Sequence, residues 1–522
     1  MTTASSSRVA ASASAASIES LTRRASLNMV SAALRQVARF FTSFIVSPII
    51  IRGLGVELYG SWMMIQQTVG YLSLSDLRAS GTLKYTLATS QHSEDDEQRR
   101  RHVGAALLVW ARMLPIILAL GAITIWATPR FIRTASEHVL PVRAAMAFAI
   151  LNLAIDQLFS LPGNVLRGMN LDFKAMGLTA FVILVSGLFS VAAIKLGWGL
   201  PGVSFVGVLG AIILGAVRYR VARKELPWFG VARPTRAELS SFARLTGWLF
   251  AGSIADLLLY SSDLLLIGIV LGPKAAAIYA TTGAVLRMII DPVFSVFGAV
   301  NPGVAGICGR RDWERLQRVR LELHSSAVTA MAIIGVGVVM LNEAFLRLWI
   351  GPGFYGGMVT NILLVLIAFE GIPLRADTAI VDGLLQFRPK ALITAVSGAL
   401  GLVIGAIGAP TFGLPGIAIG TMIGRSINVI AFPILIRRGS GISAMEYARV
   451  MVRPVSVALV MIALAARFPL HPETRLGFAL ATACVGAATA LLAWGLGLPP
   501  VPREQMRRRF VSQLSRGPHR AA

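Results

Sequence analysis

The stretch GLPGVSFVGVLGAIILGAV, residues 199–217, decides the fold class of this protein. It opens with a helix-interrupting Gly-Leu-Pro-Gly and continues as an uncharged apolar run, close to the roughly 20 residues that a membrane-spanning helix needs. The same opening recurs at Gly413-Leu414-Pro415-Gly416-Ile417, about 214 residues later. We therefore expect membrane-spanning helices, arranged as a duplication.

The composition of the whole chain points the same way. Of its 522 residues, 55% are hydrophobic and 14% are charged, and the mean hydropathy is +0.70. Soluble domains carry roughly 25% charged residues. No loop exceeds about 30 residues, which leaves no room for an extramembrane catalytic domain of the usual ~50 residues or more. We therefore predict an all-α, polytopic membrane protein that is not an enzyme.

Apolar runs of about 20 residues predict about fourteen spans. Their expected ranges are 27–51, 58–79, 103–127, 141–163, 175–196, 200–217, 245–271, 276–304, 323–346, 357–376, 391–410, 415–436, 450–468 and 475–497. The predicted organisation is a flexible cytoplasmic tail (1–26), a first six-helix bundle (27–217), a basic cytoplasmic linker (218–244), a second six-helix bundle (245–437), two extra helices (438–497) and a basic cytoplasmic tail (498–522).

Basic residues are distributed unevenly between the two sides of these spans. The chain has 49 Lys and Arg against 25 Asp and Glu, a net charge of +24. Roughly 34 of the basic residues fall in the tails and loops on one side and roughly 8 on the other, and such an excess is typical of the cytoplasmic side. Both termini are therefore predicted to be cytoplasmic. No basic segment is interleaved with stacking aromatics, so nucleic acid is not an expected partner.

Further anchors support the duplication. Val185-Ser186-Gly187 recurs as Val396-Ser397-Gly398, Gly168 with Phe173 recurs as Gly383 with Phe387, and Leu54-Gly55 before Tyr59 recurs as Leu271-Gly272 before Tyr279. Six helices per repeat is an even number, so both halves have the same orientation and are related by an axis along the membrane normal. We expect two bundles facing each other across a central cleft, with the last two helices outside the repeat.

Local motifs refine this picture without adding a reaction. Thr235-x-x-Glu238 is a capping box, and acidic Asp95 to Glu97 precede basic Arg99 to Arg101, so two inner loops should continue as helix. Gly416, Gly420 and Gly424 predict close helix contact. Cys308 and Cys484 suggest no disulfide or zinc site. Motifs for nucleotide or metal chemistry are absent from the sequence, and we expect no cofactor.

Arginines within the spans are the strongest candidates for binding. Arg35 and Arg39 are four residues apart, hence on one helix face, roughly 12–18 Å from the cytoplasmic end. Ionisable groups at membrane depth usually face a cavity or a partner, and guanidinium binds phosphate in a bidentate fork. We predict that Arg35 and Arg39 bind an anionic substrate group, with Arg287 and Arg425 as second-rank candidates.

Acids in the spans are open to two interpretations. They are Asp76, Asp156, Asp256, Asp263, Asp291 and Glu370. Some are expected only to neutralise arginines, and Arg287 is spaced to pair with Asp291. Asp256 and Asp263 lie two turns apart on one face of the predicted seventh span. They are candidates for carrying a coupling proton or cation, or for pairing with a buried arginine.

Two segments resemble a known family. In the first half these are Arg39, IRGLG at 51–55, Tyr59-Gly60, Trp62 and GYLSLSD at 70–76; in the second half they are DLLLIG at 263–268, Leu271-Gly272 and Tyr279. Over about residues 27–497 the chain is similar to bacterial polysaccharide transporters, the O-antigen and exopolysaccharide flippases. These belong to the multidrug/oligosaccharidyl-lipid/polysaccharide flippase superfamily.

The resemblance implies a flippase of the bacterial inner membrane, moving undecaprenyl-diphosphate-linked oligosaccharide outward for lipopolysaccharide or exopolysaccharide biosynthesis. Polysaccharide polymerase and chain-length proteins are then possible partners, and membrane lipids surround the bundle. The cleft arginines would hold the diphosphate. Two alternatives remain at this point: a multidrug or cation antiporter of the same superfamily, which should have an acidic cleft, and a membrane glycosyl polymerase or ligase, which should have a long periplasmic loop.

Overall fold

The computed structural model describes residues 3–73, 79–89, 95–132 and 134–497. Within these ranges the chain forms helices and no strand, which confirms the predicted all-α fold. The chain divides into two compact units, Met1–Ser253 and Ile254–Ala522. This boundary lies inside the predicted seventh span, 245–271, and not in the basic stretch 218–244.

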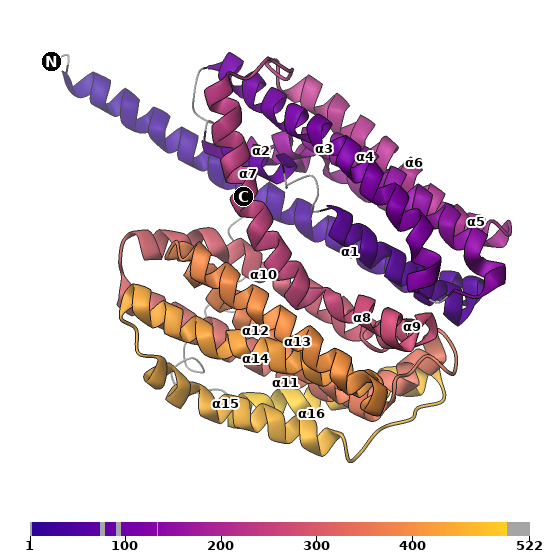
Figure 1. Ribbon diagram of the computed structural model, residues 1–522. Helices are drawn as coiled ribbons and strands as arrows, with labels where there is room; N and C mark the ends of the chain where they lie inside the picture. Colours follow the sequence, from indigo (N-terminus) through magenta and orange to yellow (C-terminus); the bar gives the residue numbers. More distant parts are fainter. Residues whose placement is uncertain (1–2, 74–78, 90–94, 133, 498–522) are drawn as a thin grey trace. The chain divides into compact units, whose positions relative to one another are not determined.

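The helices follow one another along the chain as Figure 1 shows. The first unit contains α1 (Thr3–Leu72), α2 (Ala79–Thr89), α3 (Asp96–Phe131), α4 (Val139–Gly168), α5 (Met176–Lys195), α6 (Gly199–Glu225) and most of α7 (Arg236–Tyr260), with 3₁₀ turns η2 (Ser136–His138) and η3 (Asp172–Ala175). The second unit contains α8 (Ser262–Leu271), α9 (Pro273–Thr282), α10 (Ala284–Gly309), α11 (Trp313–Trp349), α12 (Gly357–Gly383), α13 (Phe387–Phe412), α14 (Leu414–Ser440), α15 (Ala444–Ala465), α16 (Arg475–Leu492) and the π-helical turn η4 (Ala493–Gly497).

Among the described residues, 11 helices, or up to 12 with one bent pair, are long and apolar enough to cross a membrane. The expected fourteen are therefore not reached by this criterion. One reason is that the predicted spans 27–51 and 58–79 are joined in α1, which is interrupted only at Gly55 (φ 75°, ψ 170°). A multi-pass membrane protein is nevertheless what this helix inventory requires.

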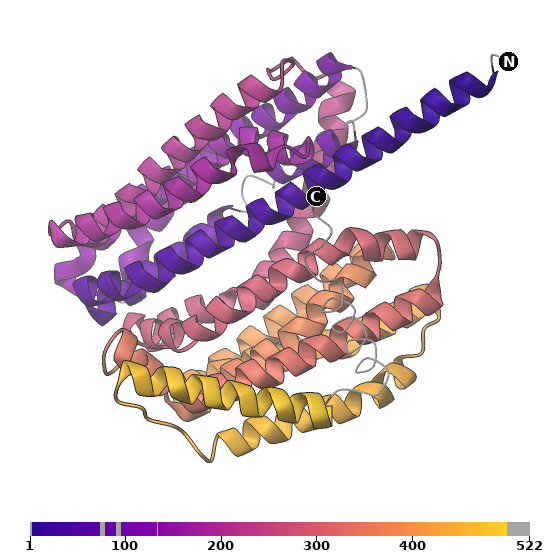
Figure 2. The same cartoon turned by 180° about the vertical axis from the view of Figure 1, so that it is seen from behind.

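The two ends of the chain differ from the prediction in different ways. α1 begins at Thr3, so it includes most of the stretch 1–26 that was expected to be a flexible tail, and Figure 2 shows it as one long ribbon. The Ala-rich sequence explains a helix here, because alanine has the highest helix propensity. The predicted basic tail, 498–522, lies outside the described residues.

Left-handed turns occur at matching positions in the two units. α4 ends at Gly168 and is followed by Asn170 at φ 56°, while α12 ends at Gly383 and is followed by Leu385 at φ 58°. The Gly-Leu-Pro-Gly motifs place Gly199 (φ 55°) and Gly413 (φ 61°) directly before or at the start of α6 and α14. Gly55 and Gly272 have similar positive φ values, 75° and 90°, and the same ψ of 170°. The repeat seen in the sequence is thus also a repeat of backbone geometry.

α13 and α14 pack closely through glycines, as the GxxxG pattern predicts (Figure 1). A Cβ atom added at Gly420 would come within 2.3 Å of the Gly405 nitrogen and 2.5 Å of the Gly401 oxygen. Side chains larger than hydrogen would force these backbones apart. The two C-terminal helices, α15 and α16, both pack against α11.

The loop between α6 and α7 is held against the start of α3. Arg100 Nε donates to the main-chain oxygen of Trp228 at 2.8 Å, and the Trp228 side chain is buried. The predicted capping box forms, with the Thr235 nitrogen donating to Glu238 Oε2 at 2.8 Å and the Glu238 nitrogen donating to Thr235 Oγ1 at 3.2 Å. Asp95 likewise caps α3. The basic stretch is therefore partly helical, as expected, and its loop is fixed to the first unit.

Candidate functional site

A group of five charged side chains gathers where α1, α4, η3 and α6 of the first unit meet. We call this group the first-unit charge cluster. It consists of Arg218 and the four charged residues that interact electrostatically with it, Arg35, Asp156, Arg167 and Asp172. Three guanidinium groups face two carboxylates. The cluster as a whole therefore has one more positive than negative charge.

Asp172 is the acceptor at the centre of this cluster. Its Oδ2 lies 2.9 Å from Arg35 Nη1, and its Oδ1 lies 3.7 Å from Arg167 Nε. The left-handed Asn170 explains the position, because it ends α4 and turns the chain into η3, where Asp172 is the first residue. Arg167 lies in the last turn of α4. A single loop thus places an acid between two arginines from different helices.

Arg218 is the least satisfied member of the cluster. Its side chain crosses α4 at Gly163, where a Cβ atom would come within 3.0 Å of Arg218 Cδ. Its Nε is buried and has no hydrogen-bond partner in the described part of the chain. An unpaired buried guanidinium nitrogen beside an excess positive charge is suited to an anion that brings acceptor oxygens.

The predicted pair Arg35 and Arg39 is divided by the structure. Arg35 is half-buried in the cluster, with 14% of its side chain exposed, whereas Arg39, one turn along α1, is exposed. Sequence reasoning found no acid near Arg35 because Asp172 lies far away along the chain. It also missed Arg167, and it assigned Arg218 to the predicted basic linker 218–244.

The second-rank arginines lie in the second unit. Arg287 folds back over Gly283 and donates through Nη2 to the main-chain oxygen of Ala280. Arg425 is 9% exposed, and its guanidinium carbon lies 5.0 Å from the ring centroid of Tyr260. Because these contacts are within that unit, neither residue belongs to the first-unit charge cluster.

The two acids proposed for ion coupling, Asp256 and Asp263, lie on two different helices and not on one continuous span as predicted. The predicted seventh span breaks between α7 and α8, whose axes differ by 51°. Asp256 is exposed on α7, while Asp263 lies in the first turn of α8 and accepts a hydrogen bond from Tyr279 Oη at 2.9 Å. The helix break after Tyr260 separates the two carboxylates.

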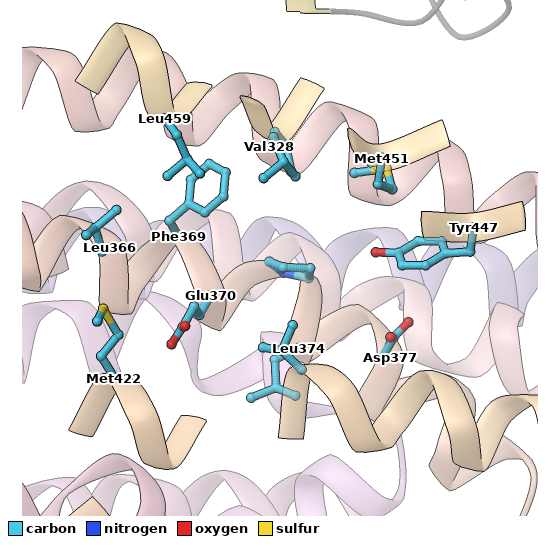
Figure 3. Close-up of a pocket in the computed structure, with 13 residues that line it drawn as sticks. Val328, Leu366, Phe369, Glu370, Leu374, Asp377, Met422, Tyr447, Met451 and Leu459 are labelled. Atoms are coloured by element: carbon cyan, nitrogen blue, oxygen red, sulfur yellow. The ribbon is translucent and has the colours of Figure 1, made fainter. Parts of the chain in front are cut away.

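A cavity of about 430 Å³ lies within the second unit, and we call it the second-unit cavity. Figure 3 shows it between side chains of α11, α12, α14 and α15. Its lining is mainly apolar, and its polar members are Glu370, Asp377 and Tyr447. Volumes of this order are typical of small-molecule sites.

Buried polar groups close one end of this cavity. Arg320 Nε and Nη2 each donate to Asp377 at 2.7 Å, in a bidentate pair between α11 and α12. His324 Nε2 lies 3.1 Å from the main-chain oxygen of Pro373, and its Nδ1 is hydrogen-bonded to the Tyr447 hydroxyl of α15. We call Arg320, His324, Asp377 and Tyr447 the buried tetrad, and it joins the extra helix α15 to α11 and α12.

Comparisons with known proteins agree on the family and the fold. The family described as "Polysaccharide biosynthesis protein" matches residues 27–305. The protein named "Uncharacterized membrane protein EpsK" of Bacillus subtilis (strain 168) is 23% identical over 450 residues, which is 80% of this chain and 84% of that protein.

Solved structures with the same fold include the lipid II flippase MurJ in an inward closed conformation. It has a TM-score of 0.63 and 13% identity, covering 89% of this chain and 97% of MurJ. An inward-facing multidrug resistance MATE family transporter of the MOP superfamily has a TM-score of 0.57 and 15% identity, covering 78% of this chain and 98% of the transporter. The fold is that of this superfamily, as the sequence resemblance implied.

Proposed function

This chain belongs to the polysaccharide biosynthesis protein family, and we propose that it moves a lipid-diphosphate-linked oligosaccharide from the cytoplasmic to the outer leaflet. The undecaprenyl carrier and the bacterial inner membrane, with both termini cytoplasmic, are part of the same proposal. The solved structures of like fold are named as a flippase and as a transporter, which supports transport over catalysis.

The observation that carries this proposal is the first-unit charge cluster. A diphosphate is compact, strongly anionic and rich in acceptor oxygens, and it matches a surplus of guanidinium donors. The unpaired Nε of Arg218 is one donor ready to receive it. A drug or cation antiporter would instead be favoured by an acidic surplus.

Asp172 gives the cluster a way to release its ligand. In the structure it forms ion pairs with Arg35 and Arg167. A bound diphosphate would compete with Asp172 for these guanidinium groups, and the carboxylate would recover them when the substrate leaves. Reversible binding of this kind suits a transporter, which needs affinity high enough to capture and low enough to let go.

The experiment is the sidedness of the lipid-linked oligosaccharide in a strain that lacks the gene. We expect the lipid-linked unit to accumulate on the cytoplasmic side and a plasmid copy to relieve this. Arg35→Ala and Arg218→Ala should each lower transport by about 10- to 100-fold, since a charged hydrogen bond contributes about 1.5–3 kcal/mol. Arg39→Ala should have a smaller effect, because Arg39 is exposed outside the ion pair.

Arg130→Ala is the matched control, because Arg130 lies over the Trp126 ring in the last turn of α3 and outside the cluster. Full activity of Arg35→Ala and Arg218→Ala at normal expression would contradict the assigned site. A normal distribution of the lipid-linked oligosaccharide between the two leaflets of the deletion strain would contradict the proposed substrate. Loss of polymerisation with sidedness unchanged would instead indicate a polymerase or ligase.

A further inference from the structure

Glu370 lies at the centre of helix α12, a candidate membrane span, and at the wall of the second-unit cavity. It is 13 residues from each end of α12, Gly357–Gly383, or about 20 Å at 1.5 Å per residue. Figure 3 shows its carboxylate beside Met422, with Leu366 and Phe369 on the same helix. A carboxyl group at this depth is costly and is therefore a candidate for function.

The two carboxylate oxygens of Glu370 have different surroundings. Oε1 accepts a hydrogen bond from Ser426 Oγ of α14 at 2.6 Å. Oε2 is buried and has no hydrogen-bond partner among the described residues. A buried polar atom without a partner costs free energy comparable to a lost hydrogen bond. Binding a proton at Oε2 would therefore stabilise the Glu370 carboxyl group.

Neighbouring helices supply few charges to Glu370. From α14 the cation facing it is Arg425, which donates through Nη1 to the Ile367 oxygen at 3.4 Å and forms no ion pair with Glu370. Ionisable groups on α12 and on the elements that pack against it or line the cavity include Tyr279 of α9, Arg287 and Asp291 of α10, Arg320, Glu322, His324 and Glu343 of α11, Arg375, Asp377 and Asp382 of α12, Arg388 and Lys390 of α13, and Tyr447 of α15.

Most of those groups are engaged elsewhere. In the buried tetrad Arg320 pairs with Asp377 and His324 with Tyr447, while Arg320 Nη1 has no hydrogen-bond partner among the described residues. Lys390 pairs with Asp382 at 2.7 Å near the ends of α12 and α13. Arg287 donates to its own backbone. Among the described residues, the interactions found for the Glu370 carboxylate are the hydrogen bond from Ser426 and the attraction of Arg425.

We propose that Glu370, which lines the second-unit cavity, binds and releases one proton in each transport cycle through its carboxylate oxygen Oε2. This inference rests on the proposed function. A sodium ion fits less well, because it needs several oxygen ligands to replace its water shell. No group of three or more His, Cys, Asp or Glu suited to a metal is found among the described residues. A proton needs only the one free oxygen.

Protonation of Glu370 would change the contact between α12 and α14. In the charged form, Ser426 donates to a carboxylate, and such a charge-assisted hydrogen bond is roughly twice as strong as a neutral one. Adding a proton weakens that bond and removes a negative charge near Arg425. The proton taken up on one side of the membrane is released on the other, so charge and mass balance in each cycle. Proton binding is thereby linked to helix packing in the second unit.

The test uses the full-length protein in liposomes with a fluorescent undecaprenyl-diphosphate oligosaccharide and an imposed pH gradient. We expect the gradient to raise the wild-type flipping rate about tenfold, within the usual range of coupling. Glu370→Gln cannot exchange the proton and should abolish this stimulation. Glu370→Asp keeps a carboxyl group and should retain part of it, which separates proton exchange from a folding defect.

Glu343→Gln on α11 is the control, because Glu343 does not line the cavity, and it should respond to the gradient like the wild type. Stimulation of Glu370→Gln equal to wild type would overturn the inference. A wild-type protein driven by a sodium gradient and not by pH would also overturn it. If the wild type moves no substrate under any condition, the proposed function itself fails.

Discussion

In the first unit, the loop after α4 carries Asp172, which forms ion pairs with Arg35 and Arg167. The side chains of Arg35 and Asp172 are 14% and 11% exposed. In the second unit the corresponding loop follows Leu385, and the central acid, Asp377, lies inside α12. Its ion pair with Arg320 is almost completely buried, with 1% and 6% of the two side chains exposed.

The difference shows that repeated backbone geometry does not preserve the position of charge. Matching turns end α4 and α12, yet one unit has a charge cluster with an excess guanidinium group and the other a bidentate, buried ion pair. An ion pair that is partly solvated can exchange partners at lower cost than one that is almost completely buried. We interpret the first arrangement as suited to binding and the second as suited to holding α15 in place.

The largest expected effect comes from breaking the buried pair. Arg320→Ala leaves Asp377 as an uncompensated buried charge and should destabilise the second unit by about 3–5 kcal/mol. Asp172→Asn in the first unit should cost much less, because its pair is partly solvated. Thermal unfolding of both purified variants in detergent measures the two costs, and equal losses would contradict the comparison.

A smaller effect is expected where the repeats differ in residue size. Val206 in α6 corresponds to Gly420 in α14, counted from the two Gly-Leu-Pro-Gly motifs. Gly420→Val places a side chain against the Gly405 backbone and should cost about 1–3 kcal/mol, the usual range for overpacking. The folded fraction after extraction reports this loss. The converse substitution, Val206→Gly in the first unit, removes packing without causing a clash. It tests whether a smaller residue at this repeat position destabilises the first unit as a larger one is expected to destabilise the second.

A stabilising substitution is predicted at the matched turns. Leu385 adopts φ 58° and is 75% exposed, whereas the first unit has Asn170 at this position. Left-handed backbone costs about 1–2 kcal/mol for an ordinary residue and less for asparagine. Leu385→Asn should therefore raise the melting temperature, and Asn170→Leu should lower it. A melting temperature unchanged in both variants would show that the turns are held by their surroundings alone.

The smallest effect concerns the cap of α7. Backbone and side-chain hydrogen bonds from Thr235 hold the pKa of Glu238 below its ordinary value of 4.5. The stability from this lowered pKa is fully present above the ordinary value and is lost as the pH falls through the folded value. Unfolding measured from neutral to acidic pH should show this slope in the wild type, and Glu238→Gln should lack it.

Much of the fold could be predicted from the sequence because it depends on local patterns. Apolar length predicts a multi-pass all-α protein, Thr235-x-x-Glu238 predicts the cap and glycine spacing predicts the α13–α14 contact, and the structure contains each of these, with 11 or up to 12 spans among the described residues where fourteen were expected. The break between α7 and α8 was missed, because Tyr260 and Ser261 carry no Pro or Gly signal.

The candidate site could be predicted only in part. The position of Arg35 inside a predicted span made it a candidate for binding. Its neighbours could not be predicted, because they lie on other helices. Arg167 and Arg218 resemble ordinary basic residues at the ends of spans, where topology signals are common. Glu370 was recognised as an acid at membrane depth, while its Ser426 partner and its cavity depend on three other helices.

By itself, the sequence determined that this chain crosses the membrane many times, that its halves repeat and that arginines lie within its spans. Only the tertiary structure decided that Asp172 joins Arg35, that Arg320 is closed off by Asp377, and that Glu370 retains a free oxygen. The physical reason is that hydrophobic length and turn residues act locally. The rotation of each helix about its axis, which selects the partner of every charge, is set by packing against its neighbours.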